Sequence, residues 1–351
     1  MDTTQAASLR TKLSFWLLLG VLSVAVAEVS VGSAPFAFVN PVETVFLTVF
    51  YGSHLLVVAW LAFRRGWPTL TALWLGGVLF GLYEFYITKV LWAPPWGDTI
   101  SLGHIDVVAL IVLVFFWHPF MAFVFPLSIA ETVGTRSRSV ARQLPDWFTS
   151  ASPRKIILAG IIAALTHGLL MDSPGVALIS TASALTAIGL ATWWWRRGSA
   201  GTSWTLRELL PNDRQGKAVA IVLLGQYLLL SPLMNAADIP PMLGHVIVWL
   251  LYGGFGLLFW SAGRESTPSA QVAPSHHKTW PTGRLIQWAG ALLVLSALGS
   301  LGQPGIGYVI VWLGAIIVGL RMLIGTLRHM LRPQPASRQR DDHDGDPAHR
   351  L

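Results

Sequence analysis

The sequence PTLTALWLGGVLFGLYEFYITKVLW, residues 68–92, is almost entirely apolar and is long enough to cross a lipid bilayer as one helix. It nevertheless contains two ionisable residues, Glu84 and Lys89. A charged group at membrane depth is costly, so such residues usually face other helices or a water-filled cavity and take part in function. The stretch therefore predicts both a membrane helix and a polar site inside a helical bundle.

The composition of the whole chain agrees with a membrane location. Of its 351 residues, 53% are hydrophobic and only 12% are charged. A water-soluble protein of this size needs a larger share of polar residues to cover its surface. We therefore expect an all-α, polytopic membrane helix bundle whose main partner is the lipid bilayer.

About ten segments of the sequence are long and apolar enough to be membrane helices, because a span needs roughly 20 such residues. The expected spans are residues 12–30, 42–63, 68–92, 104–130, 155–171, 175–195, 217–236, 241–262, 284–302 and 306–327.

The basic residues predict the orientation of the chain. Of the 24 Lys and Arg residues, all but Lys89 fall in the loops and termini on one side of the ten expected spans. Cytoplasmic loops carry such an excess, so both termini are expected in the cytoplasm, with the chain in an inner or plasma membrane. The net charge of +7 is then explained by loops near anionic lipid, and no nucleic-acid partner is needed.

The ionisable residues within the expected spans divide the chain into two halves. Most of them lie in residues 1–173, which we interpret as a five-helix half that carries the functional groups. Residues 174–332 form a second five-helix half that reads mainly as scaffold, and residues 333–351 have the composition of a disordered cytoplasmic tail.

Three residues of the first half are the candidate catalytic groups: Glu84, His118 and His167. Glu84 would act as a general base, and the two imidazoles would hold a metal or stabilise an oxyanion, which is the combination that activates water. Further polar residues at or near the outer mouth, or at depth on the second span, are candidates for binding a substrate or ion. These residues are Glu43, His54, Lys89, Asp106 and Asp172.

The first functional hypothesis is a membrane-embedded hydrolase. The order and separations of Glu84, His118 and His167 are loosely similar to those in the CAAX protease and bacteriocin-processing family of intramembrane glutamate proteases. That family has a second glutamate and an arginine where this chain has Tyr83 and Thr88, so the resemblance assigns no family. The chain contains no cysteine, which excludes a cysteine nucleophile and a thiolate metal site. A divalent metal is a candidate cofactor.

Three alternatives from other classes remain open. A transporter coupled to protons or cations would use the Glu and His residues as a proton relay. A haem-binding electron carrier would use His54 and His118, which are expected at similar depth. A non-catalytic assembly protein would use the polar cluster only to fix helix packing.

Overall fold

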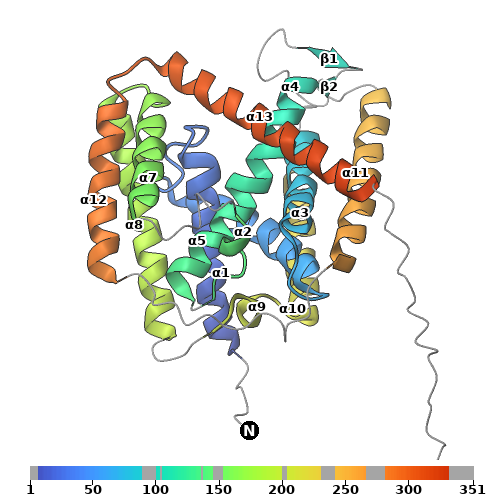
Figure 1. The fold of residues 1–351 in the computed structure, drawn as a ribbon. Coiled ribbons are helices and arrows are strands. Elements are labelled where there is room, and N and C mark those ends of the chain that lie inside the picture. The colour runs from blue at the N-terminus through green and yellow to red at the C-terminus, as the bar shows by residue number, and fades with distance from the viewer. Residues whose placement is uncertain are drawn as a thin grey trace, which may run out of the picture.

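The computed structural model describes residues 7–88, 100–102, 105–135, 137–144, 153–199, 204–230, 242–265 and 281–331. Nearly all of these residues are helical, as Figure 1 shows. Within these described ranges, six helices are long and apolar enough to cross a membrane, and two further apolar helices are shorter. The expected class of a helical membrane protein with several spans is therefore confirmed, whereas a count of ten spans is not established by length and composition.

The N-terminal half consists of helices that are interrupted by π-helical segments. Helix α1 (Leu9–Val24) continues into π segment η1 (Ala25–Val29), and α3 (Leu70–Tyr83) continues into π segment η2 (Glu84–Thr88). Helix α2 (Pro41–Phe63) lies between them in sequence. One continuous helix then follows, which we call the η3 rod. It is composed of α4 (Val107–Ala109), the π-helical η3 (Leu110–Val124) and α5 (Phe125–Gly134). Two short antiparallel strands, β1 (Ser101–Leu102) and β2 (Ile105–Asp106), precede that rod.

In the described residues after α5, the longer helices are not interrupted by π-helical segments. These are α7 (Pro153–Leu169), α8 (Pro174–Gly198), α10 (Asp213–Leu230), α11 (Met242–Ala262), α12 (Thr282–Gly299) and α13 (Pro304–Leu331). The short elements are η4 (Ala141–Gln143), α9 (Leu206–Leu209) and η7 (Gly263–Glu265). Each of the ten stretches predicted to span the membrane overlaps one helix or continuous series of helical segments in the described residues.

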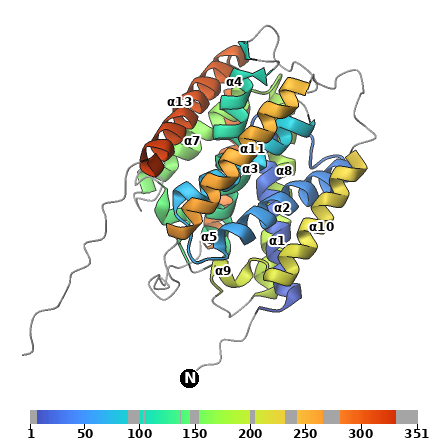
Figure 2. The same cartoon turned by 90° about the vertical axis from the view of Figure 1, so that its right-hand side faces the viewer.

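The N-terminal helices form the centre of the bundle. In the span that starts at Leu9, 78% of the residues are buried inside the protein, whereas the share is 17% in α11 and in α13. Helix α3 packs mainly on η3, and α1 packs on α2 and α8. The C-terminal helices surround this centre: α10 lies against α2, α11 against α3, and α12 against α7 and α8 (Figures 1 and 2).

Helix ends follow ordinary capping rules. The side chains of Ser8, Asn40 and Thr69 accept hydrogen bonds from backbone N–H groups in the first turns of α1, α2 and α3, respectively. Pro41 follows directly after Asn40 at the first helical position, where its missing N–H costs nothing. These caps explain why the apolar runs begin as helices where they do.

Candidate functional site

The centre of the candidate site is a direct contact between Glu84 and His118. Glu84 is the first residue of η2, and a carboxylate oxygen of this residue bonds to Nε2 of His118 in η3. The His118 side chain is 1% exposed and that of Glu84 is 18% exposed. Nδ1 of His118 lies 3.0 Å from the backbone oxygen of Leu113, so this nitrogen must be a donor.

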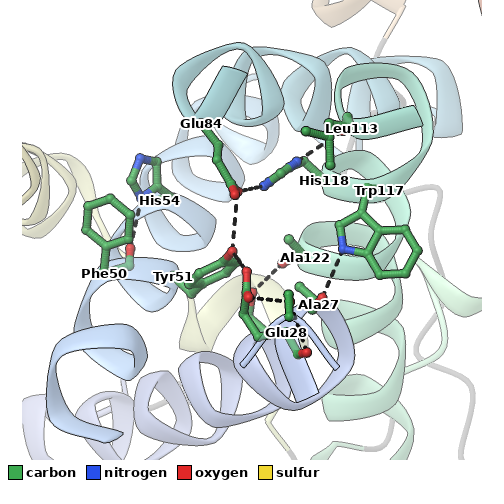
Figure 3. A network of polar contacts seen from close by, with 12 residues as sticks. Ala27, Glu28, Phe50, Tyr51, His54, Glu84, Leu113, Trp117, His118 and Ala122 are labelled. Atoms are coloured by element: carbon green, nitrogen blue, oxygen red, sulfur yellow. Dashed lines mark hydrogen bonds and ion pairs between the residues drawn. The ribbon is translucent and has the colours of Figure 1, made fainter. Parts of the chain in front are cut away.

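The polar contacts continue from Glu84 to a second carboxylate, Glu28. The hydroxyl of Tyr51, on α2, bonds to Glu28 in η1 and lies 3.4 Å from the Glu84 carboxylate (Figure 3). Ser33, which is exposed, donates a hydrogen bond of 2.5 Å to the other oxygen of Glu28. The chain of contacts therefore begins at the protein surface and ends at a fully buried imidazole.

The contacts of this network require more protons than the one on Nδ1 of His118. Because Nδ1 of His118 is a donor, the contact between Nε2 and Glu84 needs one further proton, carried by either the imidazole or the carboxyl group. Tyr51 has a single hydroxyl hydrogen and two carboxylate neighbours. One of its two contacts therefore needs a hydrogen from Glu28 or Glu84. Groups that share hydrogens in this way can pass a proton along the chain.

Three of the four residues of this network lie on π-helical segments. Glu28 is in η1, Glu84 is in η2 and His118 is in η3, whereas Tyr51 is in an ordinary α-helix. A π segment rotates the residues that follow it relative to an α-helix, and such segments are frequent at functional sites. In η3, Pro119 lacks an N–H, and nearby backbone oxygens are bonded by side chains instead: that of Phe115 by Trp74 and that of Leu113 by His118.

Glycines bring the backbones of α3 and η3 close together below this network. A β-carbon on Gly77 would lie 2.3 Å from the α-carbon of Pro119, and one on Gly81 would lie 2.9 Å from the α-carbon of Val114. The two glycines lie seven and three residues before Glu84, on the helix that delivers it. Their small size therefore determines how close Glu84 and His118 can be.

An aromatic cluster forms the other wall of the site. His54 donates from Nδ1 to the backbone oxygen of Phe50 (2.8 Å), and its Nε2 bonds to the hydroxyl of Tyr227 (2.5 Å). Its ring stacks on Phe80 at 4.6 Å between ring centres, and Phe80 also contacts His118 at 5.2 Å. Both ring nitrogens of His54 and of His118 are bonded to protein groups. Haem ligation needs one free ring nitrogen on each histidine, so the geometry does not favour it.

The third predicted catalytic residue, His167, has different partners. It lies on α7, where Nδ1 bonds to the backbone oxygen of Ser30 and Nε2 to the hydroxyl of Thr181, each at 3.0 Å. Thr181 in turn bonds to Ser296 on α12 at 2.9 Å. These contacts tie α7, α8 and α12 to the end of η1, and His167 bonds to neither Glu84 nor His118.

The predicted binding residues are dispersed. Asp106 caps α4 through the N–H of Ala109 (2.8 Å), Asp172 is exposed in the turn between α7 and α8, and Glu43 is partly exposed in the first turn of α2. Lys89 lies outside the described residues. His54 is next to the network through its aromatic neighbours but does not bond to Glu84.

Two members of the network were not among the residues predicted as a site. Glu28 reads in the sequence as an interfacial residue near the end of an apolar run, and Tyr51 as part of an apolar and aromatic wall. Helical periodicity does not point to Glu28, because η1 departs from the α-helical repeat. It does place Tyr51 beside the face of α2 that carries Glu43 and His54. The second half also contributes to the site, since Tyr227 on α10 bonds to His54, and His245 on α11 bonds to Tyr86 at 2.8 Å.

Another buried carboxylate, Glu131, has a different role at the opposite end of the η3 rod. It is fully buried and accepts hydrogen bonds from the backbone N–H groups of Ser139, Val140 and Ala141 and from the hydroxyls of Ser137 and Ser139, at 2.5–3.1 Å. Burial lowers the pKa of the adjacent Arg138 guanidinium, and the charge of Glu131 opposes this shift. Glu131 therefore organises the loop that follows α5.

A divalent metal, the candidate cofactor, would need several ligand side chains close together. Within the part of the chain that the structure describes, no three or more His, Asp and Glu side chains are grouped so that they could share a metal ion.

Comparison with known proteins gives the family. Residues 17–336 match the model of an uncharacterized membrane protein family, and the chain belongs to that family. It is also similar to an uncharacterized protein of Archaeoglobus fulgidus (strain ATCC 49558 / DSM 4304 / JCM 9628 / NBRC 100126 / VC-16), with 33% identity over 251 residues, which cover 69% of this chain and 75% of the relative. No solved structure matches the chain.

Proposed function

We propose that this membrane protein couples its activity to proton movement, as a proton-coupled transporter of a small solute. The observation that supports this most directly is the chain of contacts from Ser33 through Glu28, Tyr51 and Glu84 to His118. Carboxylates and imidazoles arranged in series within membrane helices are the usual components of proton relays. In this proposal, Glu28 exchanges protons with the surface, and the Glu84–His118 pair holds a proton in the interior.

The arrangement of the four groups suits a carrier because they come from four different structural segments. Glu28, Tyr51, Glu84 and His118 are supplied by η1, α2, η2 and η3, respectively. Protonation of the Glu84–His118 pair changes the charge between η2 and η3, so it would change the preferred spacing of these two segments. Proton binding could in this way be coupled to a rearrangement that moves a solute.

The direct test is proton flux in proteoliposomes. Purified protein would be reconstituted with a pH-sensitive dye inside, and a membrane potential would be imposed with potassium and valinomycin, with and without mixtures of small solutes outside. Glu84→Gln keeps the shape of the side chain but removes its charge and its titration, and we expect it to reduce flux to the level of empty liposomes. Glu43→Gln, on the partly exposed carboxylate at the start of α2, is the matched control and should keep wild-type flux. Wild-type flux in Glu84→Gln would contradict the relay.

A second candidate is an intramembrane hydrolase with Glu84 as the general base. The observation in its favour is the bond between Glu84 and His118, together with the 18% exposure of the Glu84 side chain. His167 separates the two candidates. As a catalytic group it would be needed for hydrolysis of an amphiphilic ester or a membrane peptide, whereas the relay predicts that His167→Gln keeps proton flux.

We also propose that all ten main helices or rods span the membrane with both termini in the cytoplasm. The basic loops support this orientation by the positive-inside rule. Because the chain has no cysteine, single introduced thiols report sidedness without background. Asp172→Cys should react with a membrane-impermeant maleimide from outside, and Ser199→Cys should react only after the membrane is opened. The reverse pattern would invert the topology.

A further inference from the structure

A basic pocket lies where the C-terminal part of α13 meets the start of α3. It has a volume of about 610 Å³ and is lined by Arg321, Arg328, Thr71 and Thr326, together with the apolar groups of Leu70, Met322, Ile324 and Gly325. It is separate from the Glu84–His118 network, and none of its lining residues is acidic. From this pocket, we propose that the protein has a specific binding site for an anionic phospholipid.

The position of Arg321 gives the first argument for a bound anion. Arg321 lies within the apolar helix α13, ten residues before its end at Leu331, which corresponds to about 15 Å of helix. It is exposed on the surface of the protein, and no acidic side chain of the described residues pairs with it. A guanidinium on a membrane-facing helix surface is costly without a counter-charge, and a lipid phosphate supplies one.

Arg328 adds a second donor on the same face. It is seven residues from Arg321, or two helical turns, so both side chains project from one side of α13. Arg328 is also exposed and, among the described residues, has no acidic partner. Two arginines offer planar donor groups that match the oxygens of a phosphate.

The start of α3 provides a third contribution. Leu70 and Thr71 occupy the first turn of this helix, whose N-cap Thr69 bonds to the N–H of Ala72. The N–H groups of a first turn have no acceptor within the helix and favour an anion beside them. The hydroxyls of Thr71 and Thr326 complete the polar lining.

The shape of the site favours a lipid over a free anion. Helix α13 crosses the bundle obliquely, and Gly319 packs against Ile111 and Phe115 of η3 before the pocket begins (Figure 1). The pocket combines basic donors with the apolar surfaces of Leu70, Met322 and Ile324. A phospholipid matches this pattern, with its phosphate on the arginines and its acyl chains along the apolar residues.

The test is lipid binding by the full-length protein in neutral detergent, measured by native mass spectrometry during titration with phosphatidylglycerol or phosphatidylcholine. We expect preferential binding of phosphatidylglycerol. Each of Arg321→Gln and Arg328→Gln should weaken this binding about five-fold, and the double variant about 30-fold. Arg214→Gln, at an exposed arginine on α10, is the matched control and should bind like the wild type. Equal binding by the wild type and the double variant, or an equal loss in Arg214→Gln, would overturn the proposal.

Two further arms distinguish the lipid from other occupants. Inorganic phosphate at millimolar concentration should not displace phosphatidylglycerol, and full displacement would reassign the pocket to a free phosphate. The C-terminal segment of the chain contains Asp341, Asp342, Asp344 and Asp346, which are also anionic. Their replacement by Asn should leave lipid binding unchanged, and a several-fold gain would assign the pocket to that segment.

Discussion

Gly77 and Pro119 are in backbone contact, and a β-carbon added to Gly77 would lie 2.3 Å from the α-carbon of Pro119. Neither atom belongs to a flexible side chain, so Gly77→Ala must push α3 and η3 apart. We expect a loss of about 2 kcal/mol or more in stability and a loss of proton flux, because the Glu84–His118 contact lies between the same two elements. Gly253→Ala is the control, since no atom lies within 4 Å of the added carbon. Both variants would be compared by thermal unfolding in detergent and by flux. Wild-type behaviour of Gly77→Ala would show that the close approach is not required.

The hydroxyl of Tyr51 contacts both Glu28 and Glu84. Tyr51→Phe removes the hydroxyl and keeps the ring, so the helix packing of α2 should be preserved. We expect proton flux to fall by at least about 100-fold, which is the scale of a positioned proton-transfer group. Tyr308→Phe, at a hydroxyl on the exposed side of α13, should have no effect. An unchanged rate in Tyr51→Phe would mean that protons reach Glu84 by another route.

Glu131 is a structural carboxylate whose removal should affect stability and leave proton transfer intact. Glu131→Gln would turn an amide NH₂ group towards backbone N–H donors, so at least one buried donor would lose its acceptor. We expect destabilisation of about 2–4 kcal/mol and faster proteolysis of residues 137–144. The comparison is Glu43→Gln, which makes the same change at a partly exposed position. Equal melting temperatures for the two variants would contradict this role.

Asp213 gives a prediction for pH dependence outside the membrane. The hydrogen bond from Trp60 Nε1 at 3.0 Å, followed by the charge of Arg64, lowers the pKa of this exposed carboxyl group. A group whose pKa is lower in the folded state contributes stability above its unfolded pKa of about 4 and loses that contribution as the pH falls through the folded pKa. Asp213→Asn should therefore lower the melting temperature slightly at pH 7, and this effect should diminish as the pH falls below about 4. Asp172→Asn, at an exposed acid in a turn, serves as the control, and an effect of Asp213→Asn that does not diminish over this range would contradict this account.

The positions of the helices could be predicted from the sequence because length and hydropathy determine them directly. Each expected span falls on a helix, including α3 and η2, despite Glu84 within the stretch. Glu84 and His118 could be selected as candidates because an ionisable residue in an apolar run is unusual. This signal does not depend on how the helices face one another.

Their partners could not be predicted, for physical reasons. Whether His118 meets Glu84 or His167 depends on the rotation of three helices, and hydropathy does not encode rotation in a bundle that is apolar on nearly all sides. Glu28 was missed because the π turn of η1 shifts the face on which it lies, and Tyr51 because an aromatic residue in an apolar run gives no sign of a polar partner. The second half was interpreted as scaffold, but Tyr227 reaches His54 from α10.

The π segments make the site depend on the number of residues in each helix as well as on their identity. A π turn contains about one residue more than an α turn, so deletion of one residue from Ala25–Val29 or Glu84–Thr88 could restore the α-helical repeat. Restoring it would rotate the part of the helix after the deletion by about 100°, so a deletion before Glu28 would turn that carboxylate away from Tyr51. Loops usually tolerate the insertion or deletion of a single residue. Within these helices, we expect such a change to disrupt the site.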